Sequence, residues 1–275
     1  MKHTVIIITS ILLLLACEDV PKVASDNYVI EAYLFSGEEV KEVVIKTMVP
    51  LSDPEGESEI IRSALVVIKK NNESYTLTYN PATSKYRYEA TDLTIVPQDF
   101  IEIEVDVNGR IATGSTVMPT APEGLQLSKS EMLIPEIKSA ADFIGNNPLE
   151  DAEITMSWSN PDNELYYTVI EFRSFYLRPI LPRDVQEVVD GILEDFAIIS
   201  APSTDTTFTI NGALLPSYGP YVAKVYKVNQ EYADLYDSET QDSRDLNEPP
   251  SNIINARGIF SGFTGDSISF EVIKK

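Results

Sequence analysis

The sequence has few of the residues that most catalytic and metal sites use. Among its 275 residues there is one cysteine, Cys17, and one histidine, His3, so residues 18–275 contain neither. This excludes from that part of the chain a Ser-His-Asp or Cys-His nucleophile system and the histidine and cysteine ligand sets of most zinc sites. We therefore do not expect an enzyme, and we nominate no catalytic, cofactor-binding or metal-ligating residue.

Phosphate-binding loops and an excess of basic residues are also lacking. The 12 glycines are scattered, and neither G-x-G-x-x-G nor G-x-x-x-x-G-K-[ST] occurs. Asp and Glu number 43 against 21 Lys and Arg, which gives a net charge of −22 at pH 7. Because such a charge repels phosphate groups, the composition excludes nucleic-acid binding and adhesion to anionic lipid through a basic patch.

The most apolar stretch is too short to span a bilayer. It covers residues 5–15, interrupted only by Thr9 and Ser10, whereas a transmembrane helix needs about 20 apolar residues. With Lys2 ahead of it, this stretch has the length of a secretory hydrophobic region, about 7 to 15 residues. We therefore predict that residues 1–16 are a signal peptide.

The cleavage region "LLAC" resembles a bacterial lipobox, in which a small residue precedes a cysteine that is acylated and becomes the first mature residue. The resemblance implies that Cys17 carries acyl chains such as palmitate, which anchor the protein to a membrane. The alternative is an ordinary signal peptide followed by a free thiol. Residues 17–26 then form a lipidated, flexible stalk, in which Glu18 and Asp19 resemble the acidic signal that sends Bacteroidetes-type lipoproteins to the cell surface.

Residues 27–120 predict an N-terminal β-sandwich. Short runs of alternating polarity are broken by turn residues, as in "YVIEAYLF" and "FIEIEVDV". In the second run Glu102, Glu104 and Asp106 alternate with apolar residues, so we interpret these acids as a solvated strand face. Two hairpins are predicted at Asn71-Asn72 and Asn108-Gly109, where positive φ is tolerated. "MPTAPEG" then indicates a joint between domains.

Residues 121–275 resemble a fibronectin type III domain. Trp158 ends one strand, a turn follows around Pro161, and "TTFTI" and "YGPYVAKVYKV" supply later strands, with Tyr221 in the penultimate one. The fold class is therefore mainly β, with two immunoglobulin-like or fibronectin type III-like sandwiches. Residues 183–196 have helical periodicity and predict a short amphipathic insertion in the second sandwich, either a lid, a docking element or a cover for a sheet edge. "NQEYADLYDSE" predicts another short helix.

Two further segments are candidates for binding. Acids concentrate in residues 237–245, which could hold calcium, although the D-x-[DN]-x-[DN]-G order is absent and a solvated loop is the simpler interpretation. "EPPSNIINARGIFSGF" predicts a long irregular approach to a last strand, "SISFEVI", and is a candidate docking segment.

The lipobox, "YVIEAYLFSGEEV", "LYYTVIEF", "VYKVNQEYADLY" and "EPPSNIINARGIFSGF" together resemble an uncharacterised family of Bacteroidetes-type outer-membrane lipoproteins, known only as a domain of unknown function. Its members accompany TonB-dependent transporters. The resemblance implies a lipid-anchored outer-membrane protein, exposed at the surface or to the periplasm, that partners such a transporter in nutrient uptake.

The function that these observations favour is a non-enzymatic accessory or ligand-binding lipoprotein. The 14 tyrosines could anchor a glycan or a peptide, although most lie on predicted strands, where packing is the ordinary explanation. The alternatives are a carboxylate-based hydrolase resembling glycoside hydrolases, which needs two acids facing each other across a substrate, and a surface adhesion protein.

Lipidation at Cys17 is directly testable. Mass spectrometry of the protein extracted from membranes should find acyl chains on an N-terminal Cys17. The Cys17→Ser variant should no longer be found in the membrane fraction, because it lacks the two or three acyl chains, each worth about 0.8 kcal/mol per buried methylene, that form the anchor. Recovery of an unmodified thiol from membrane-bound protein would contradict this prediction.

Overall fold

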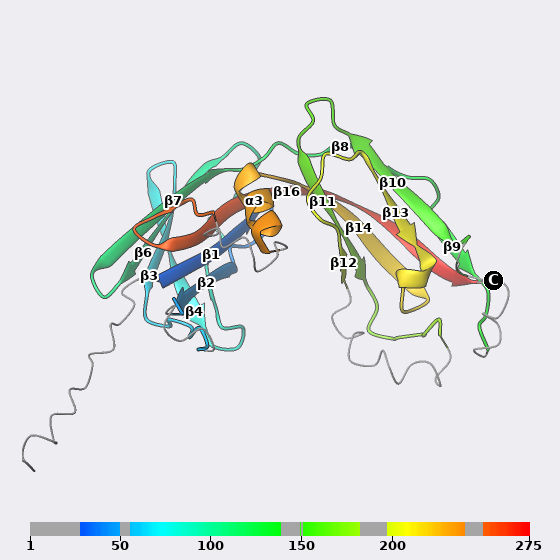
Figure 1. Ribbon diagram of the computed structural model, residues 1–275, viewed down its shortest axis with the longest axis horizontal. Helices are drawn as coiled ribbons and strands as arrows, with labels where there is room; N and C mark the ends of the chain where they lie inside the picture. Colours follow the sequence, from blue (N-terminus) through cyan, green and yellow to red (C-terminus); the bar gives the residue numbers. More distant parts are fainter. Residues whose placement is uncertain (1–27, 50–55, 139–148, 150, 182–196, 240–249) are drawn as a thin grey trace, which may run out of the picture.

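The computed structural model describes residues 28–49, 56–138, 149, 151–181, 197–239 and 250–275. These residues form mainly β-strands, with one α-helix, α3 (Gln230–Glu239), and one short 3-10 helix, η2 (Gly212–Leu214). The strands build two β-sandwiches side by side, which confirms the predicted fold class (Figure 1). Within this part of the chain, none of the helical segments has the length and apolar character needed to cross a membrane.

Alternating polarity places the strands of the first sandwich. In β1 (Tyr28–Phe35) every second residue is buried, including Ile30 and Leu34. In β6 (Phe100–Val107) Ile101 and Ile103 face the core, and Glu102 lies on the opposite, exposed face, as predicted. Because side chains alternate across a strand, each strand covers the core with one face only.

The two sheets of the first sandwich share one strand. One sheet has the order β16-β1-β2-β5-β4 and the other β4-β3-β6-β7-β15. Residues 73–77 of β4 pair with β3, and residues 78–80 pair with β5, so β4 passes from one sheet to the other. The remaining strands are β2 (Glu42–Thr47), β3 (Leu65–Lys70), β4 (Glu73–Asn80), β5 (Lys85–Arg87), β7 (Arg110–Val117) and β15 (Ile253–Ile254).

Both predicted hairpin turns are confirmed. Asn71 and Asn72 have φ of 52° and 67°, and they connect β3 to β4. Asn108 and Gly109 have φ of 55° and 86° between β6 and β7, and the Gly109 amide donates to the Asp106 carboxylate at 2.7 Å. Positive φ at both central residues matches the right-handed twist of the paired strands.

The second sandwich packs a three-stranded sheet against a larger one. The order β13-β10-β8 faces β12-β11-β14-β16, and β9 adds to the far edge of β16 in parallel. These strands are β8 (Glu123–Leu127), β9 (Glu131–Ile134), β10 (Glu153–Ser159), β11 (Leu165–Phe172), β12 (Ala197–Ile199), β13 (Thr207–Asn211) and β14 (Gly219–Val228).

Trp158 and Tyr221 both lie in the core of the second sandwich. Trp158 is 7 % exposed and packs beside Tyr166, with ring centroids 5.9 Å apart. The Tyr221 hydroxyl donates to the Ser217 carbonyl at 2.8 Å and accepts from the Ser217 amide at 3.2 Å. A buried tyrosine near the start of the penultimate strand, bonded to backbone a few residues upstream, is a tyrosine corner of the kind found in immunoglobulin-like sandwiches.

The last strand, β16 (Arg257–Lys274), belongs to both sandwiches. Its first seven residues pair in parallel with β1, and residues 263–272 pair antiparallel with β14 (Figure 1). Gly258 permits the first pairing: its φ is 118°, and a Cβ there would lie 1.9 Å from the Ile30 carbonyl oxygen. The β1–β16 contact therefore depends on a residue without a side chain.

The structure differs from the sequence-based expectation at the C-terminus. The segment expected to approach the last strand irregularly is largely regular, because β15 pairs with β7 and β16 begins at Arg257.

The helix in "NQEYADLYDSE" is confirmed as α3. The amphipathic insertion at 183–196 lies outside the described residues. The division at residue 120 stays a prediction, and β15 and β16 join the end of the chain to the first sandwich.

Replacing Gly258 with alanine should destabilise the protein by about 3 kcal/mol or more, because the new methyl group overlaps the Ile30 backbone. Gly109→Ala is the matched control: its φ is also positive, but no atom lies within 4 Å of the added Cβ. The control should cost only about 1 kcal/mol. Urea denaturation measures both, and equal losses would contradict the role assigned to Gly258.

Candidate binding pocket at the junction

Aromatic side chains meet where the two sandwiches join. In β1 the alternation that buries Ile30 and Leu34 in the first core turns Tyr33 and Phe35 to the opposite face. There they pack against aromatic residues of β11, β14, β16 and α3. We refer to this group as the junction cluster: Tyr33, Phe35, Tyr167, Tyr226, Tyr232 and Phe263.

The second sandwich contributes to the junction cluster because two of its strands are buried on both faces. In β11, Tyr166 and Ile170 lie in the second core, whereas Tyr167 lies in the junction cluster. In β14, Val225 lies in the second core and Tyr226 in the junction cluster. Fully buried strands of this kind are typical where a sheet is covered on both sides.

Phe263 lies at the centre of the junction cluster and is 2 % exposed. Its ring stacks on Phe35 with centroids 5.0 Å apart. It stands nearly perpendicular to Tyr167, at 88°, and to Tyr232, at 78°. Aromatic pairs in such geometries contribute about 0.5–1.5 kcal/mol each beyond the burial of their area. The rings therefore hold the two sandwiches in one arrangement.

A pocket of about 230 Å³ opens beside these rings. Phe263 and Tyr167 are buried at its base, whereas Tyr33 and Tyr236 are half-buried and within reach of solvent. Its walls come from β1, β11, β16 and α3, and no charged side chain lines it. The lining consists of Tyr33, Phe35, Tyr167, Tyr232, Leu235, Tyr236 and Phe263.

Helix α3 is fixed over the junction by polar contacts near its N-terminus. The Asn229 side-chain amide donates to the Thr116 hydroxyl and to the Val117 carbonyl, each at 3.0 Å. The Glu231 carboxylate accepts from the hydroxyls of Thr116 and Ser261, each at 3.3 Å. Because Thr116 is on β7 and Ser261 on β16, the helix that carries Tyr232 and Tyr236 is held against the first sandwich.

The connection between the sandwiches is also held by side chains. The Thr264 hydroxyl donates to the Pro119 carbonyl at 2.7 Å, and the Lys227 ammonium donates to the Thr120 hydroxyl at 2.5 Å. Lys227 also forms an ion pair with Glu164. Burial lowers the pKa of Lys227, although the charges of Asp162 and Glu123 act in the opposite direction. The joint predicted at "MPTAPEG" is therefore tied to β14 and β16.

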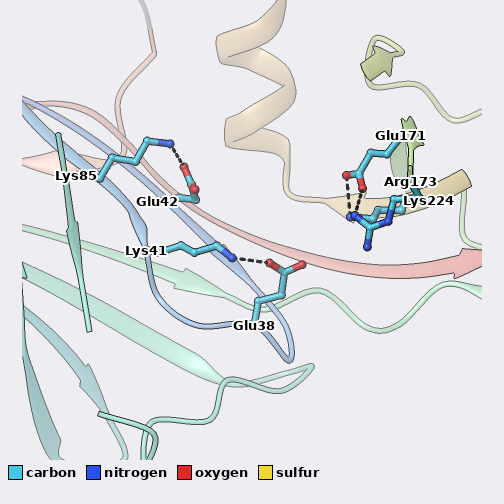
Figure 2. Close-up of polar contacts among 7 residues, drawn as sticks. All are labelled: Glu38, Lys41, Glu42, Lys85, Glu171, Arg173 and Lys224. Carbon is cyan, nitrogen blue, oxygen red and sulfur yellow. Dashed lines mark hydrogen bonds and ion pairs between the residues drawn. The ribbon is translucent and has the colours of Figure 1, made fainter. Parts of the chain in front are cut away.

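Charged pairs lie on the surfaces of both sandwiches. On the first, Glu38 pairs with Lys41 at 3.6 Å, and Glu42 pairs with Lys85 (Figure 2). On the second, Glu171 pairs with Lys224 at 2.8 Å and with Arg173 at 3.2 Å (Figure 2). These pairs are partly exposed, and exposed pairs contribute little to stability, about 0–1 kcal/mol.

Burial raises the pKa of Tyr167 well above its usual range, and the negative charges of Glu38 and Glu171 add to the rise. Burial also raises the pKa of Tyr226. Both phenols therefore stay protonated at physiological pH. The pocket offers ring faces and neutral hydroxyls, which suit binding better than proton transfer.

Of the segments singled out from the sequence, the candidate docking segment ends at Phe263 in this pocket, and the described part of the acidic segment directly follows Tyr236. Cys17 is outside the described residues, as is most of the acidic segment 237–245. On β6, Glu104 pairs with Lys69 across the sheet at 2.5 Å. The described residues contain no group of three or more His, Cys, Asp or Glu side chains placed to hold a metal ion.

Sequence reasoning missed the junction cluster. Strand packing is the ordinary explanation of its tyrosines, although Tyr33 and Phe35 occupy the positions that alternation assigns to the outward face of their strand. Two neighbouring aromatic residues on an outward face were the available signal, because such a face is usually polar in a sandwich that stands alone.

Comparison with known proteins gave one family match. The model of a family described as "Domain of unknown function (DUF4249)" matches residues 18–269. No match was found among curated proteins.

Comparison with solved structures gave distant similarities. A two-domain fibronectin type III segment from chicken tenascin is 8 % identical, with 90 % of this chain and 99 % of that chain covered and a TM-score of 0.25. The FN1–FN3 domains of chicken CNTN1 are 12 % identical, with coverages of 90 % and 65 % and a TM-score of 0.26. A multidomain segment of titin is 10 % identical, with coverages of 74 % and 61 % and a TM-score of 0.20. With scores this low, the fold assignment stands on the strand order and the tyrosine corner.

The shared strand and the junction cluster predict that the two sandwiches unfold together. Calorimetry should show one transition, with equal calorimetric and van't Hoff enthalpies. Phe263→Ala should lower the stability of the whole protein by about 3–5 kcal/mol, because it removes the central ring. Phe100→Ala, at a side chain that is 55 % exposed, is the control and should change stability by about 0.5 kcal/mol or less. Two resolved transitions in the unmodified protein would contradict this prediction.

Proposed function

This chain belongs to the DUF4249 family, and we propose that it is a membrane-anchored, non-enzymatic accessory protein of an outer-membrane TonB-dependent transporter. In this proposal the junction pocket holds a ligand that the transporter takes up. The acyl chains on Cys17 keep the protein at the outer membrane, beside its partner.

The observation that carries the proposal is the junction pocket. Aromatic side chains that solvent can reach, Tyr33 and Tyr236 among them, line a concave surface of about 230 Å³. Pockets with a mostly apolar, aromatic lining are the usual form of small-ligand sites. The pocket is also pre-formed. Its walls are fixed by β16, by the polar contacts of α3, and by the hydrogen bonds that hold the segment between the sandwiches to β14 and β16. A fixed site loses less entropy when a ligand binds than a mobile one.

The pocket supports binding rather than hydrolysis. Hydrolysis of a glycoside needs two carboxyl groups on opposite sides of the scissile bond, one of them as a general acid. The lining of the junction pocket contains no carboxyl group. The nearby carboxylates, Glu38 and Glu171, are each paired with a cation of their own sandwich. The pocket therefore gives no support to the alternative of a carboxylate-based hydrolase.

A second surface supports contact with a protein partner. The loop after β11 exposes three consecutive apolar residues: Phe175 is 103 % exposed, Tyr176 is 83 % exposed and Leu177 is 42 % exposed. Arg173 and Arg178 flank them, although the protein as a whole is strongly acidic. Exposed aromatic residues with neighbouring arginine are enriched in the centres of protein–protein interfaces. We assign this loop to the transporter contact.

Photocrosslinking on intact cells tests the partner. A photoreactive residue in place of Tyr176 should form a covalent adduct with a TonB-dependent transporter, because this side chain projects from the surface. The control position is Glu153 on β10, which is exposed on the opposite sheet of the same sandwich. An adduct with no transporter at position 176, or equal adducts at both positions, would contradict the assigned contact.

A further inference from the structure

We infer that the junction pocket binds an alkylated ammonium group, such as the head of choline or the side chain of trimethyllysine. The inference rests on the ligand site of the proposed function and adds the chemical class of the ligand. Three features support it: the angles between the rings, the hydrogen-bonding needs of the ligand and the charge of the protein.

The rings stand as walls at steep angles to one another. Tyr33 is inclined at 71° to Phe263 and at 86° to Tyr232, with centroids 5.9 Å and 6.1 Å apart. Tyr167 adds a further wall at 88° to Phe263. Rings that enclose a space from several directions can present their negative faces to one central cation, and such cages recognise quaternary ammonium groups.

The lining of the pocket offers few groups that can form hydrogen bonds with a ligand. Its polar atoms on side chains are the hydroxyls of four tyrosines: Tyr33, Tyr167, Tyr232 and Tyr236. A sugar or a primary ammonium group makes several hydrogen bonds to water. In this pocket it would lose these bonds and could not replace all of them. A trimethylated ammonium has no N–H donor, so it loses no hydrogen bonds on entering. The lining therefore favours an alkylated cation over a polyhydroxylated ligand.

The charge of the protein has the sign that a cation requires. The net charge is −22, and no cationic side chain lines the pocket. Two carboxylates, Glu38 and Glu171, act on Tyr167 through their charge, which raises its pKa together with burial. Because Lys41 and Lys224 pair with these two carboxylates, the rings supply the local attraction and the overall charge supplies the long-range attraction.

Isothermal titration of the full chain in a non-ionic polyoxyethylene detergent tests the inference. Choline is compared with 3,3-dimethyl-1-butanol, which has the same shape without the charge, and with glucose. Choline should bind about tenfold more tightly than the uncharged isostere, and added salt should weaken only the binding of choline. A peptide that carries trimethyllysine distinguishes a protein source from a small molecule: tighter binding of either compound supports the inference.

Matched variants locate the site. Tyr236→Leu removes one ring but keeps an apolar wall, and should weaken choline binding about threefold to thirtyfold. Tyr75→Leu, at a tyrosine paired with Tyr88 in the first sandwich and outside the pocket, should leave choline binding unchanged. Melting curves of both variants show whether each is folded.

Two results would overturn the inference and separate it from the proposed function. If choline and its isostere bind equally and both lose binding in Tyr236→Leu, the pocket is a ligand site but does not select a cation. Absence of binding by every cationic probe would also reject a cation, and the crosslink from position 176 would still decide the transporter contact. Choline binding that persists in Tyr236→Leu would place the site elsewhere.

Discussion

The pairing of β16 with both β1 and β14 is the constraint on which the rest of the structure depends. One continuous strand supplies a parallel neighbour to the first sandwich and an antiparallel neighbour to the second. Two separate domains joined by a linker would keep a small interface and move relative to each other. Here the orientation of the sandwiches is fixed by backbone hydrogen bonds, and Phe263 lies at the residue where the strand changes partners.

The pocket follows from this constraint. Because the strand brings the outward faces of β1 and β11 together, residues that would face water in an isolated sandwich pack against each other. The aromatic rings pack against one another in this space and leave a pocket of about 230 Å³, of which α3 forms one wall. A site assembled from two sandwiches and a helix keeps its shape only while all three stay in place, and the contacts of Asn229, Glu231 and Lys227 serve that purpose.

The strands were largely predictable from the sequence, because a half-buried strand shows its periodicity locally. The limits of β6 and the turn at Asn108 and Gly109 agree with the expectation. The pairing of Gly258 with Ile30 was not predictable, since the two residues are distant in sequence and no local pattern indicates which strands will be neighbours. The same limit hid the pocket: Tyr33 and Tyr167 come from strands whose proximity only the tertiary structure reveals.

The shared strand also has a consequence for how the protein is made. Because β16 follows every other described strand in the sequence and pairs with both sandwiches, neither hydrophobic core is closed until this strand has been synthesised. Contacts between chain segments this far apart form slowly, because the intervening chain must first be ordered. Before β16 is in place, the nascent protein therefore resembles an open sheet with unpaired edges, which is a state prone to aggregation. Loss of β16 would therefore disrupt both sandwiches and not only the second one.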